Sequence, residues 1–368
     1  MNNTINYVIF KFFHHLIKPI IYSLSMNRKI QKFLCLGIET TAHTFGASVV
    51  EYKDGKFSVL SNVRDMYKTE KGGLVPVMLS EHHVECFDRV ITEALEKSQK
   101  NIHEIQLISF SQGPGIGHAL RIGSAVARSL SLQLKIPMIG VNHCVAHQEI
   151  SCIYGAEDPV LLYASGANTQ VIAYDGGKYR VFGETLDIGV GNFLDSFGRE
   201  LGLGFPGGPK IDQMAQKAKA RNAKYTVLPY QVKGMDVSFS GLFTLLKNRI
   251  KTEKLSEIQI EDLCYSVQET IFAMLLEVTE RAMAHCEKKE LVLGGGVACN
   301  SRLKEMSIQM CKDRNAKCII PENQFLVDNA GMIAVLGIKM YEAGNITKIE
   351  NSQINPHERT DDINVNWK

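Results

Sequence analysis

The chain has 368 residues, of which 45% are hydrophobic, and this length favours two domains over one. Its formal net charge is only +2, so a nucleic-acid-binding surface would have to be local or be supplied by a partner. Nine cysteines are scattered without any Cys-x-x-Cys spacing, which argues against a disulfide framework and favours reduced thiols in a cytosol-like compartment.

The N-terminal segment is basic and partly apolar. The first 38 residues contain no Asp or Glu, and residues 8–24 are apolar except where Lys11, Lys18, a histidine pair and Pro19 interrupt them. These interruptions disfavour a stable membrane span, which needs about 20 apolar residues. Residues 1–32 could form an organellar targeting segment or an interfacial anchor, or the true start could be Met26. We treat them as an extension.

A pattern of strand, polar loop, strand, Asp-Gly turn and strand occurs twice. The first copy consists of strands over 33–38 and 47–52 and from Phe57, and the second of strands over 159–164 and 170–174 and from Tyr179. Because Asp-Gly between two apolar runs is typical of a β-hairpin, the sequence predicts a duplicated β-unit, with one copy in each domain.

Helices and buried strands alternate through the rest of the chain. Strands are predicted over 105–110, 138–141 and 290–293, and helices around 84–95, 120–134, 143–147, 193–201, 260–286 and 300–310. This alternation indicates α/β domains with central sheets. We expect lobe I to span 33–145, completed by 325–350, and lobe II, with a helical insertion, to span 146–324. The polar tail over 351–368 is expected to be frayed.

Two histidines four residues apart, His143 and His147, follow an apolar run that ends at Val141. Positions i and i+4 share one face of a helix, so both rings can reach one metal ion. Further ligands would come from distant segments, and Asp328 and Tyr163 are candidates. The alternative, that the two histidines are simply half-buried polar residues on a helix, stays open at this point.

Three glycine-containing loops are candidates for binding an anion. Residues 165–169 carry small and hydroxyl side chains between two strands, Gly113–Gly117 enters a helix, and Gly294–Gly296 lies between a strand and a helix. Each could equally serve an ordinary hairpin or close strand–helix packing, and Gly113–Gly117 lacks the lysine of a P-loop. The segment Glu39–Thr41 could play in the first unit the part that residues 165–169 play in the second.

Two further features lie between the second β-unit and the long helix. Asp212 follows the rigid turn 205–209, where its carboxylate suits a contact to ribose, although most such turns are structural. The stretch from Gln213 to Met235 contains five Lys or Arg residues and no acidic residue. It is the best local candidate for an RNA phosphate contact, the alternative being a solvated charged face.

Together these segments resemble one family, the tRNA threonylcarbamoyladenosine transferases in their archaeal/eukaryotic branch, the catalytic subunit of the KEOPS complex. The resemblance runs in order from about residue 33 to 345. The matching stretches are Gly37-Ile-Glu-Thr-Thr-Ala-His-Thr44, Gln112-Gly-Pro-Gly115, Asn142-His-Cys-Val-Ala-His147, Tyr163-Ala-Ser-Gly-Ala-Asn-Thr169, Phe182-Gly-Glu-Thr-Leu-Asp187, Phe205-Pro-Gly-Gly-Pro209, Gly294-Gly-Gly-Val-Ala-Cys-Asn300 and Asp328-Asn-Ala-Gly-Met332.

The resemblance implies an α/β fold of the actin/Hsp70/sugar-kinase type, with two lobes of RNase H-like units and a nucleotide cleft between them. It implies that His143, His147 and Asp328 are catalytic and bind one divalent metal ion, iron or zinc, with Tyr163 nearby or ligating. Magnesium would accompany the nucleotide. The residues implied to bind the substrate threonylcarbamoyl-AMP are Tyr163, Ala164, Ser165, Gly166, Ala167, Asp195, Gly208, Asp212 and Asn300.

The implied reaction moves the threonylcarbamoyl group to N6 of adenosine 37 in tRNAs that read ANN codons and releases AMP. A mixed carbamoyl–phosphate anhydride is already activated, so no Ser or Cys nucleophile is assigned, and the site has mainly to position the amine. The implied partners are tRNA and KEOPS-type subunits: a kinase-like ATPase, a dimerising subunit and a tRNA-recruiting subunit. A cytoplasmic location is implied as well.

One departure and three alternatives accompany this resemblance. The family usually has two glycines where this chain has Gly166 and Ala167, and an alanine that needed a positive φ would cost about 1 kcal/mol. A metalloprotease is disfavoured because Cys144 stands where a zinc-protease motif needs Glu. An ATP-dependent phosphotransferase of the same fold is a second enzyme class. A catalytically impaired homologue that acts as a scaffold for tRNA or partners is the non-enzyme alternative.

Overall fold

The computed structural model describes residues 32–68 and 75–368, and these form two compact units. The first unit contains the described residues up to Ile153, together with Asp328–Arg359 and Asn366–Lys368, and the second contains Tyr154–Val327 and Thr360–Val365. The first unit therefore holds both His143 and His147, because the histidine helix continues past the boundary expected at residue 145. The targeting and start-site hypotheses for residues 1–31 lie outside the described residues.

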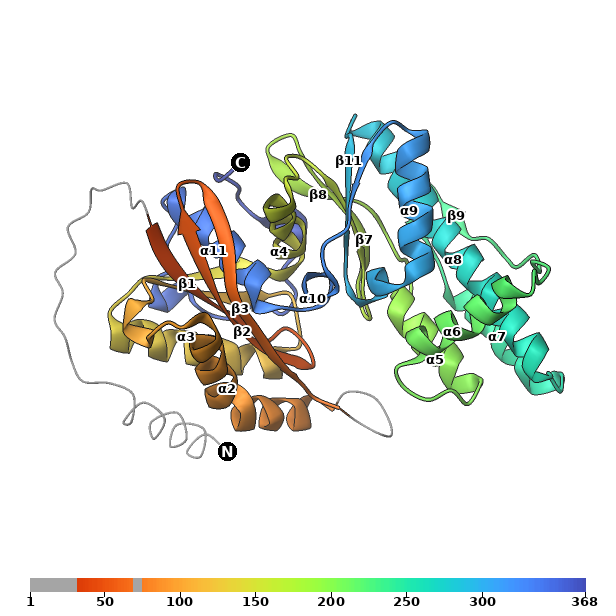
Figure 1. Cartoon of the computed structure of the whole chain (residues 1–368), viewed down its shortest axis with the longest axis horizontal. Helices are drawn as coiled ribbons and strands as arrows, with labels where there is room; N and C mark the ends of the chain where they lie inside the picture. The colour runs from red at the N-terminus through yellow and green to blue at the C-terminus, as the bar shows by residue number, and fades with distance from the viewer. Residues whose placement is uncertain (1–31, 69–74) are drawn as a thin grey trace. The chain divides into compact units, whose positions relative to one another are not determined.

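The first unit is built on a five-stranded sheet in the order β3-β2-β1-β4-β5. Its strands β1, β2 and β3 are antiparallel (Figure 1). Strands β4 and β5 run parallel to β1. The bounds are Lys32–Glu39 for β1, Thr44–Lys53 for β2, Lys56–Met66 for β3, Leu107–Gly113 for β4 and Met138–Asn142 for β5. An Asp54-Gly55 turn with positive φ at both residues joins β2 to β3, as the sequence predicts.

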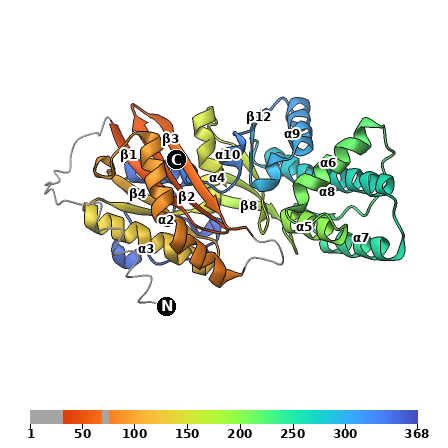
Figure 2. The ribbon, with the colours of Figure 1, turned by 60° about the horizontal axis from the view of Figure 1, so that its bottom comes forward.

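Both faces of this sheet are covered, which explains why β1 is almost continuously apolar. Leu34, Leu36 and Ile38 point into the core formed with α2 (Pro76–Ser98) and α3 (Gly117–Leu134). Gly37 points the other way, where a Cβ would lie 2.2 Å from the carbonyl oxygen of Ala330 in α11 (Ala330–Glu342). Figure 2 shows α2 and α3 together on one face of the sheet.

The C-terminal tail is ordered, and the expectation that it is frayed is wrong. The side chain of Gln112 donates hydrogen bonds to the carbonyls of Asn351 (2.9 Å) and Gln353 (2.7 Å). The hydroxyl of Ser124 donates to the carbonyl of Ser352, which is fully buried. Although polar, the tail finds partners in the side chains of Gln112 in β4 and Ser124 in α3. Its short helices are η4 (Ile349–Asn351) and η5 (Thr360–Asp362).

The second unit repeats the sheet of the first. Its order is β12-β11-β6-β7-β8, with β6, β7 and β8 antiparallel and β11 and β12 parallel to β6. The bounds are Val160–Ala164 for β6, Thr169–Asp175 for β7, Lys178–Glu184 for β8, Glu290–Gly294 for β11 and Lys317–Ile319 for β12. The predicted duplication of the β-unit is therefore confirmed by topology.

Helices make up most of the remaining second unit. They are α5 (Val190–Glu200), α6 (Gly207–Ala220), α7 (Ser240–Thr252), α8 (Glu257–His285), α9 (Ser301–Asp313) and α10 (Asn323–Leu326), with the small strands β9 (Val232–Lys233) and β10 (Asp236–Val237). The predicted turn 205–209 is only partly a turn, since its two glycines form the first turn of α6. The core joins Val160, Leu162 and Ala164 of β6 to α8, whose Val267, Ile271 and Met274 are buried.

Asp187 fixes the start of α7, and its replacement by alanine is expected to destabilise the second unit by about 2 kcal/mol. Its carboxylate accepts hydrogen bonds from the amides of Ile188 (2.7 Å), Phe239 (2.9 Å) and Ser240 (2.9 Å). Burial would raise the pKa of Asp187, but these donors hold it well below the ordinary value. Hydrogen exchange of the amides over 238–246 should accelerate in this variant and remain unchanged in the exposed control Asp313→Ala.

Within residues 32–68 and 75–368, no helix combines the length and the apolar character that crossing a bilayer requires.

Candidate functional site

The histidine helix begins at the end of a parallel strand. Strand β5 ends at Asn142, and α4 (His143–Glu149) follows at once. The side chain of Asn142 caps the helix by accepting from the amides of Cys144 (3.0 Å) and Val145 (3.1 Å). Both His143 and His147 are buried, and their rings lie 4.8 Å apart in an edge-to-face arrangement.

Asp328 lies beside both imidazoles, as the family resemblance implied. Its Oδ1 is 3.3 Å from Nε2 of His143 and 3.6 Å from Nε2 of His147. Asp328 precedes α11, whose N-terminal cap is the side chain of Asn329 bonded to the amide of Met332 (2.9 Å). Two imidazoles from α4 and one carboxylate that follows the main segment of the second unit in sequence therefore place one ligand atom each in the same small volume.

Glu39 and Thr41 complete this cluster, and the sequence interpretation gave them a different part. Glu39 is the last residue of β1, is fully buried, and has Oε2 3.1 Å from Nδ1 of His143. Thr41 donates its amide to Oε1 of Glu39 (2.6 Å), and its hydroxyl lies 3.3 Å from the same ring nitrogen of His143. A carboxylate at the carboxyl end of a buried strand was the signal that could have identified Glu39, because parallel strands gather their functional side chains at that edge.

The protonation of the cluster follows from burial and from these contacts. Burial lowers the pKa of His147, so that this imidazole is neutral at neutral pH. Burial would raise the pKa of Asp328, but its hydrogen bonds to His143 and His147 hold it well below the ordinary value, so that the carboxylate is ionised. The neutral imidazole of His147 thus faces a buried negative charge.

The donor atoms of His143, His147 and Asp328 are of the kinds that bind a divalent metal ion. When Nδ1–H of His143 donates to Glu39, the lone pair of Nε2 faces the acceptor oxygen of Asp328, and a positive charge is needed between them. A carboxylate behind a ligating imidazole is the usual device that fixes its tautomer. Two histidines and one carboxylate suit iron or zinc.

The glycine loop between β4 and α3 serves packing. A Cβ on Gly113 would lie 1.9 Å from the carbonyl oxygen of Asn355, and one on Gly115 would lie 2.6 Å from that of Thr41. The amide of Ile116 donates to the carbonyl of Thr41 (2.7 Å). This loop therefore holds the Glu39–Thr41 segment against His143, and the structural alternative explains its glycines.

In the second unit, the loop over 165–169 lies against the start of α5. The amides of Gly191 and Asn192 donate to the carbonyls of Ser165 and Gly166, each at 3.0 Å. A Cβ on Gly191 would lie 2.7 Å from Cα of Gly166, so glycine is required there. Ala167 is not among the described non-glycine residues with positive φ, and its backbone therefore does not carry the strain considered from the sequence.

The other residues predicted to bind the adenylate lie on neighbouring elements of the same unit. Asp195 of α5 accepts from the amide of Gly207 (2.8 Å), the residue before Gly208. Asp212 of α6 lies 3.4 Å from the hydroxyl of Ser301, which follows Asn300. The side chain of Asn300 caps α9, accepting from the amides of Arg302 and Leu303, and donates to Gln268 (2.8 Å). Asn300 therefore already has a structural role.

Gly295 brings the third glycine loop beside the end of β6, where residues 165–169 begin. With φ of 89°, it passes so close to β6 that a Cβ would lie 2.2 Å from the carbonyl oxygen of Ala164. Tyr163 is buried on the opposite face of β6 from Ala164. Metal ligation by Tyr163 stays a prediction, since Tyr163 belongs to the second unit.

A cavity of about 300 Å³ lies between α6, α8 and α9. It is lined by both signs of charge, with Lys219 and Arg302 opposite Glu269 and Glu305. Gln216 on its wall also contacts Asp212 (3.0 Å), so the cavity adjoins one of the predicted substrate residues.

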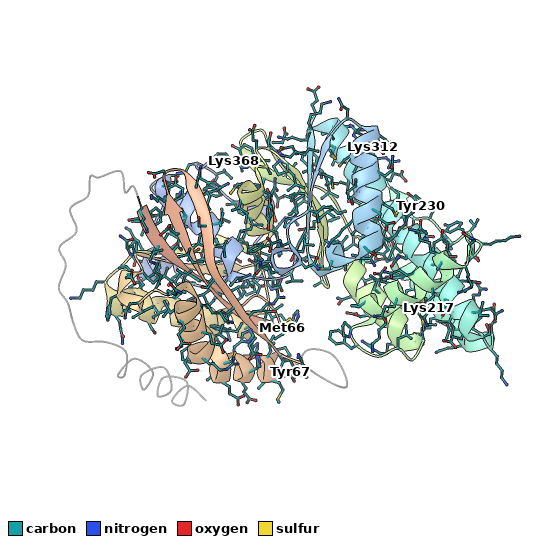
Figure 3. The ribbon with its side chains drawn as sticks, in the orientation of Figure 1. Met66, Tyr67, Lys217, Tyr230, Lys312 and Lys368 are labelled. Carbon is teal, nitrogen blue, oxygen red and sulfur yellow. The ribbon has the colours of Figure 1, made fainter. Side chains whose placement is uncertain are left out.

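Three of the five basic residues after Gln213 form ion pairs with acidic residues of other helices. Lys217, labelled in Figure 3, pairs with Glu261 of α8 (3.5 Å), and Lys219 pairs with Glu305 of α9 (2.9 Å). Arg221 contacts both Glu261 and Asp262. Ion pairing weakens the positive field that the sequence suggested, and binding of RNA at this stretch remains a prediction.

Residues 58–335 match the family model of tRNA N6-adenosine threonylcarbamoyltransferase. The chain belongs to this family. The enzyme of that name from Thermococcus kodakarensis is 51% identical over 334 residues, which cover 91% of this chain and 99% of that protein. A probable bifunctional tRNA threonylcarbamoyladenosine biosynthesis protein from Methanosarcina mazei is 49% identical over 342 residues, covering 92% of this chain and 60% of its own length.

Solved structures agree with the fold of this threonylcarbamoyltransferase family member. HypF from T. kodakarensis aligns with a TM-score of 0.59 and 16% identity, covering 85% of this chain and 48% of that chain. Component A of the (R)-2-hydroxyglutaryl-CoA dehydratase from Acidaminococcus fermentans aligns with a TM-score of 0.50 and 14% identity, covering 84% and 99%. At this identity they support the fold alone, and with the repeated sheets they confirm the actin/Hsp70/sugar-kinase type.

Proposed function

We propose that the chain transfers the threonylcarbamoyl group from threonylcarbamoyl-AMP to N6 of adenosine 37 in tRNAs that read ANN codons. Its membership of the tRNA N6-adenosine threonylcarbamoyltransferase family carries this proposal. The cluster of His143, His147 and Asp328 supports it, since a substrate phosphate and carbonyl oxygen are ligands that a metal held there would accept. In the reaction N6 bonds to the carbamoyl carbon, the bond from that carbon to the phosphate oxygen breaks, AMP keeps the electron pair, and N6 loses a proton.

The chain's own residues would bind and orient the substrates and would exclude water from the site. His143, His147 and Asp328 would hold one divalent ion, iron or zinc, with Tyr163 as a further ligand; when bound, this ion supplies Lewis acidity at the carbamoyl or phosphate oxygen. Glu39 would keep the Nδ1 proton on His143, so that Nε2 stays available. Because the anhydride is already activated, the geometry needs no side-chain nucleophile, and none is assigned.

We assign binding of the adenylate to the second unit. The proposed residues are Tyr163, Ala164, Ser165, Gly166, Ala167, Asp195, Gly208, Asp212 and Asn300. The contacts of Asp195 beside Gly208 and of Asp212 with Ser301 support a single binding region, and magnesium would accompany the nucleotide. We further propose that KEOPS-type subunits and tRNA are the partners and that the protein acts in the cytoplasm.

Reconstitution tests the proposed activity. The full chain would be incubated with KEOPS-type partner subunits, threonylcarbamoyl-AMP and unmodified tRNA, and the nucleosides analysed by mass spectrometry. We expect N6-threonylcarbamoyladenosine and one AMP per modified adenosine. A folded chain that binds tRNA but gives no modified nucleoside in any combination of partners would instead support the scaffold alternative, and ATP hydrolysis without transfer would support a phosphotransferase.

Replacing Ala167 with glycine is expected to change the affinity for threonylcarbamoyl-AMP by less than about fivefold, because less than about 1 kcal/mol of backbone freedom is at stake. The φ of Ala167 is not positive, so its methyl group imposes no strain that glycine would relieve. Gly191→Ala is the matched contrast, since its Cβ would meet Cα of Gly166 at 2.7 Å and displace the loop. Calorimetric titration of both folded variants would measure the difference, and a large gain from Ala167→Gly would contradict the expectation.

A further inference from the structure

A second group of metal-type ligands lies at the start of α2, away from the cluster at α4. His82, His83 and Cys86 each offer one ligand atom, and these atoms all lie within 4.8 Å of one another. Residue 86 lies one helical turn beyond both histidines, so its side chain projects between them. Nδ1 of His82 is 3.1 Å from Nδ1 of His83 and 4.0 Å from Sγ of Cys86.

The outer nitrogen of each ring faces an acceptor. Nε2 of His82 is 3.1 Å from Oδ1 of Asp65 in β3, and Nε2 of His83 is 3.2 Å from the carbonyl oxygen of Ala42. Asp65 also forms an ion pair with Arg89, and a carboxylate can only accept. A carbonyl oxygen can only accept as well. Both Nε2 atoms therefore carry the hydrogen.

This assignment leaves two lone pairs facing each other. In neutral rings that are protonated at Nε2, the Nδ1 atoms are bare acceptors, and at 3.1 Å they repel unless a cation lies between them. The cation is either a proton shared by the two rings or a metal ion.

The third donor favours the metal ion over the proton. A shared proton would need only the two rings, yet the buried thiol of Cys86 also points at the same space. Carboxylate and carbonyl acceptors behind both imidazoles are the outer partners that orient metal-binding histidines. Two imidazoles and one sulfur suit zinc, which binds Cys and His and takes four ligands in a tetrahedron.

We propose that His82, His83 and Cys86 bind a zinc ion, with a water molecule as the fourth ligand. The site is structural: it ties α2 to β3 through Asp65 and to the loop after β1 through Ala42. That loop also carries Thr41, whose hydroxyl lies 3.3 Å from Nδ1 of His143. Binding of zinc by Cys86 replaces the thiol proton, which is released to solvent.

Cobalt(II) substitution tests the proposal, because a thiolate ligand gives a near-ultraviolet charge-transfer band that imidazole and carboxylate ligands do not give. The full chain would be stripped of metal with a chelator, checked for its fold by circular dichroism and titrated with cobalt. We expect one equivalent to bind with this band and zinc to displace it. Cys86→Ala should abolish the band, whereas Cys35→Ala, which removes another buried thiol of the same unit, should retain it.

Two further variants separate this site from the cluster at α4. Asp328→Asn should leave the band intact, so failure of the proposed transferase activity would not affect this test. Asp65→Asn keeps all three ligands and should weaken zinc binding by about 10–100-fold. His82→Gln, at a partly exposed position, should remove binding without a core cavity if Cys86→Ala does not fold. Folded protein that binds cobalt without the band, or a band that survives both Cys86→Ala and His82→Gln, would overturn the proposal in favour of a proton shared by the histidines.

Discussion

Asp328→Asn is expected to lower the rate of threonylcarbamoyl transfer by about 10²–10⁴-fold, since Lewis-acid stabilisation is worth several kcal/mol and each 1.36 kcal/mol is a factor of ten. The substitution is nearly isosteric, so it removes the charge that faces His143 and His147 at 3.3 and 3.6 Å and changes little else. The metal content of the purified protein, measured by mass spectrometry, should fall in parallel. The gain in melting temperature on adding metal should also disappear, because a ligand stabilises only a state that binds it.

The control for this prediction is Asp54→Asn in the same unit. Asp54 is exposed at a turn with a φ of 50°, a conformation that asparagine adopts readily. This variant should keep the metal content and the transfer rate of the parent chain. A folded Asp328→Asn variant that retained both metal and activity would show that transfer does not depend on a metal ion held by this cluster.

Glu149→Gln is expected to destabilise the first unit by about 3 kcal/mol, because removing one partner of a buried ion pair leaves the other charge uncompensated. The carboxylate of Glu149 is buried at the end of α4 and lies 2.6 Å from Nζ of Lys339 and 2.8 Å from Nζ of Lys368. These contacts join the histidine helix to α11 and to the end of the tail. Urea unfolding followed by the fluorescence of Trp367, the single tryptophan of the chain, would report on this part of the unit.

The difference in unfolding free energy between the parent chain and Glu149→Gln should depend on pH. Burial would raise the pKa of Glu149, but Lys339 and Lys368 hold it below the ordinary value of 4.5. A carboxyl group with a lowered pKa stabilises the fold fully above its unfolded pKa, and the contribution is lost as the pH falls through the folded pKa. The stability gap between parent and Glu149→Gln should therefore be constant near neutrality and close as the pH drops below 4.5.

An exposed ion pair supplies the control. Glu93 and Arg89 lie one turn apart on α2 with Nη1 3.1 Å from Oε1, and about half of the Arg89 side chain is exposed. Such pairs contribute about 0.3–0.5 kcal/mol to stability, so Glu93→Gln should unfold at nearly the same urea concentration as the parent chain. Equal losses in the two variants would mean that the ion pairs of Glu149 do not hold the tail and α11 together.

Local sequence patterns predicted much of the fold. The repeated Asp-Gly hairpins predicted two copies of one β-unit, and both sheets have the same strand order. Long periodic helices such as α8 were predicted within a few residues, because their apolar spacing and caps are local features. The helix α6 was missed, since its first turn contains Gly207 and Gly208, which in sequence are typical of a turn.

The cluster at α4 was predictable only in part. His143 and His147 have a spacing that the sequence shows directly, and the resemblance added Asp328. Glu39 was placed in a phosphate loop, because nothing local shows that the end of β1 lies beside the start of α4. The prediction for the C-terminal tail was wrong for the same reason. The polarity of the tail predicted fraying, but its hydrogen-bond partners, Gln112 and Ser124, lie more than two hundred residues earlier in the sequence.

The amino-acid sequence by itself determined the family, the duplicated sheets and the histidine helix, because motifs, hairpin turns and helical periodicity are properties of neighbouring residues. Only the tertiary structure indicates which nitrogen of His143, His82 and His83 carries the hydrogen, since Glu39, Asp65 and Ala42 come from other elements. It likewise decided that Lys217 and Lys219, in the basic stretch after Gln213, are paired with Glu261 and Glu305. Charge and protonation depend on what surrounds a group in space, and the packing of distant segments fixes those surroundings.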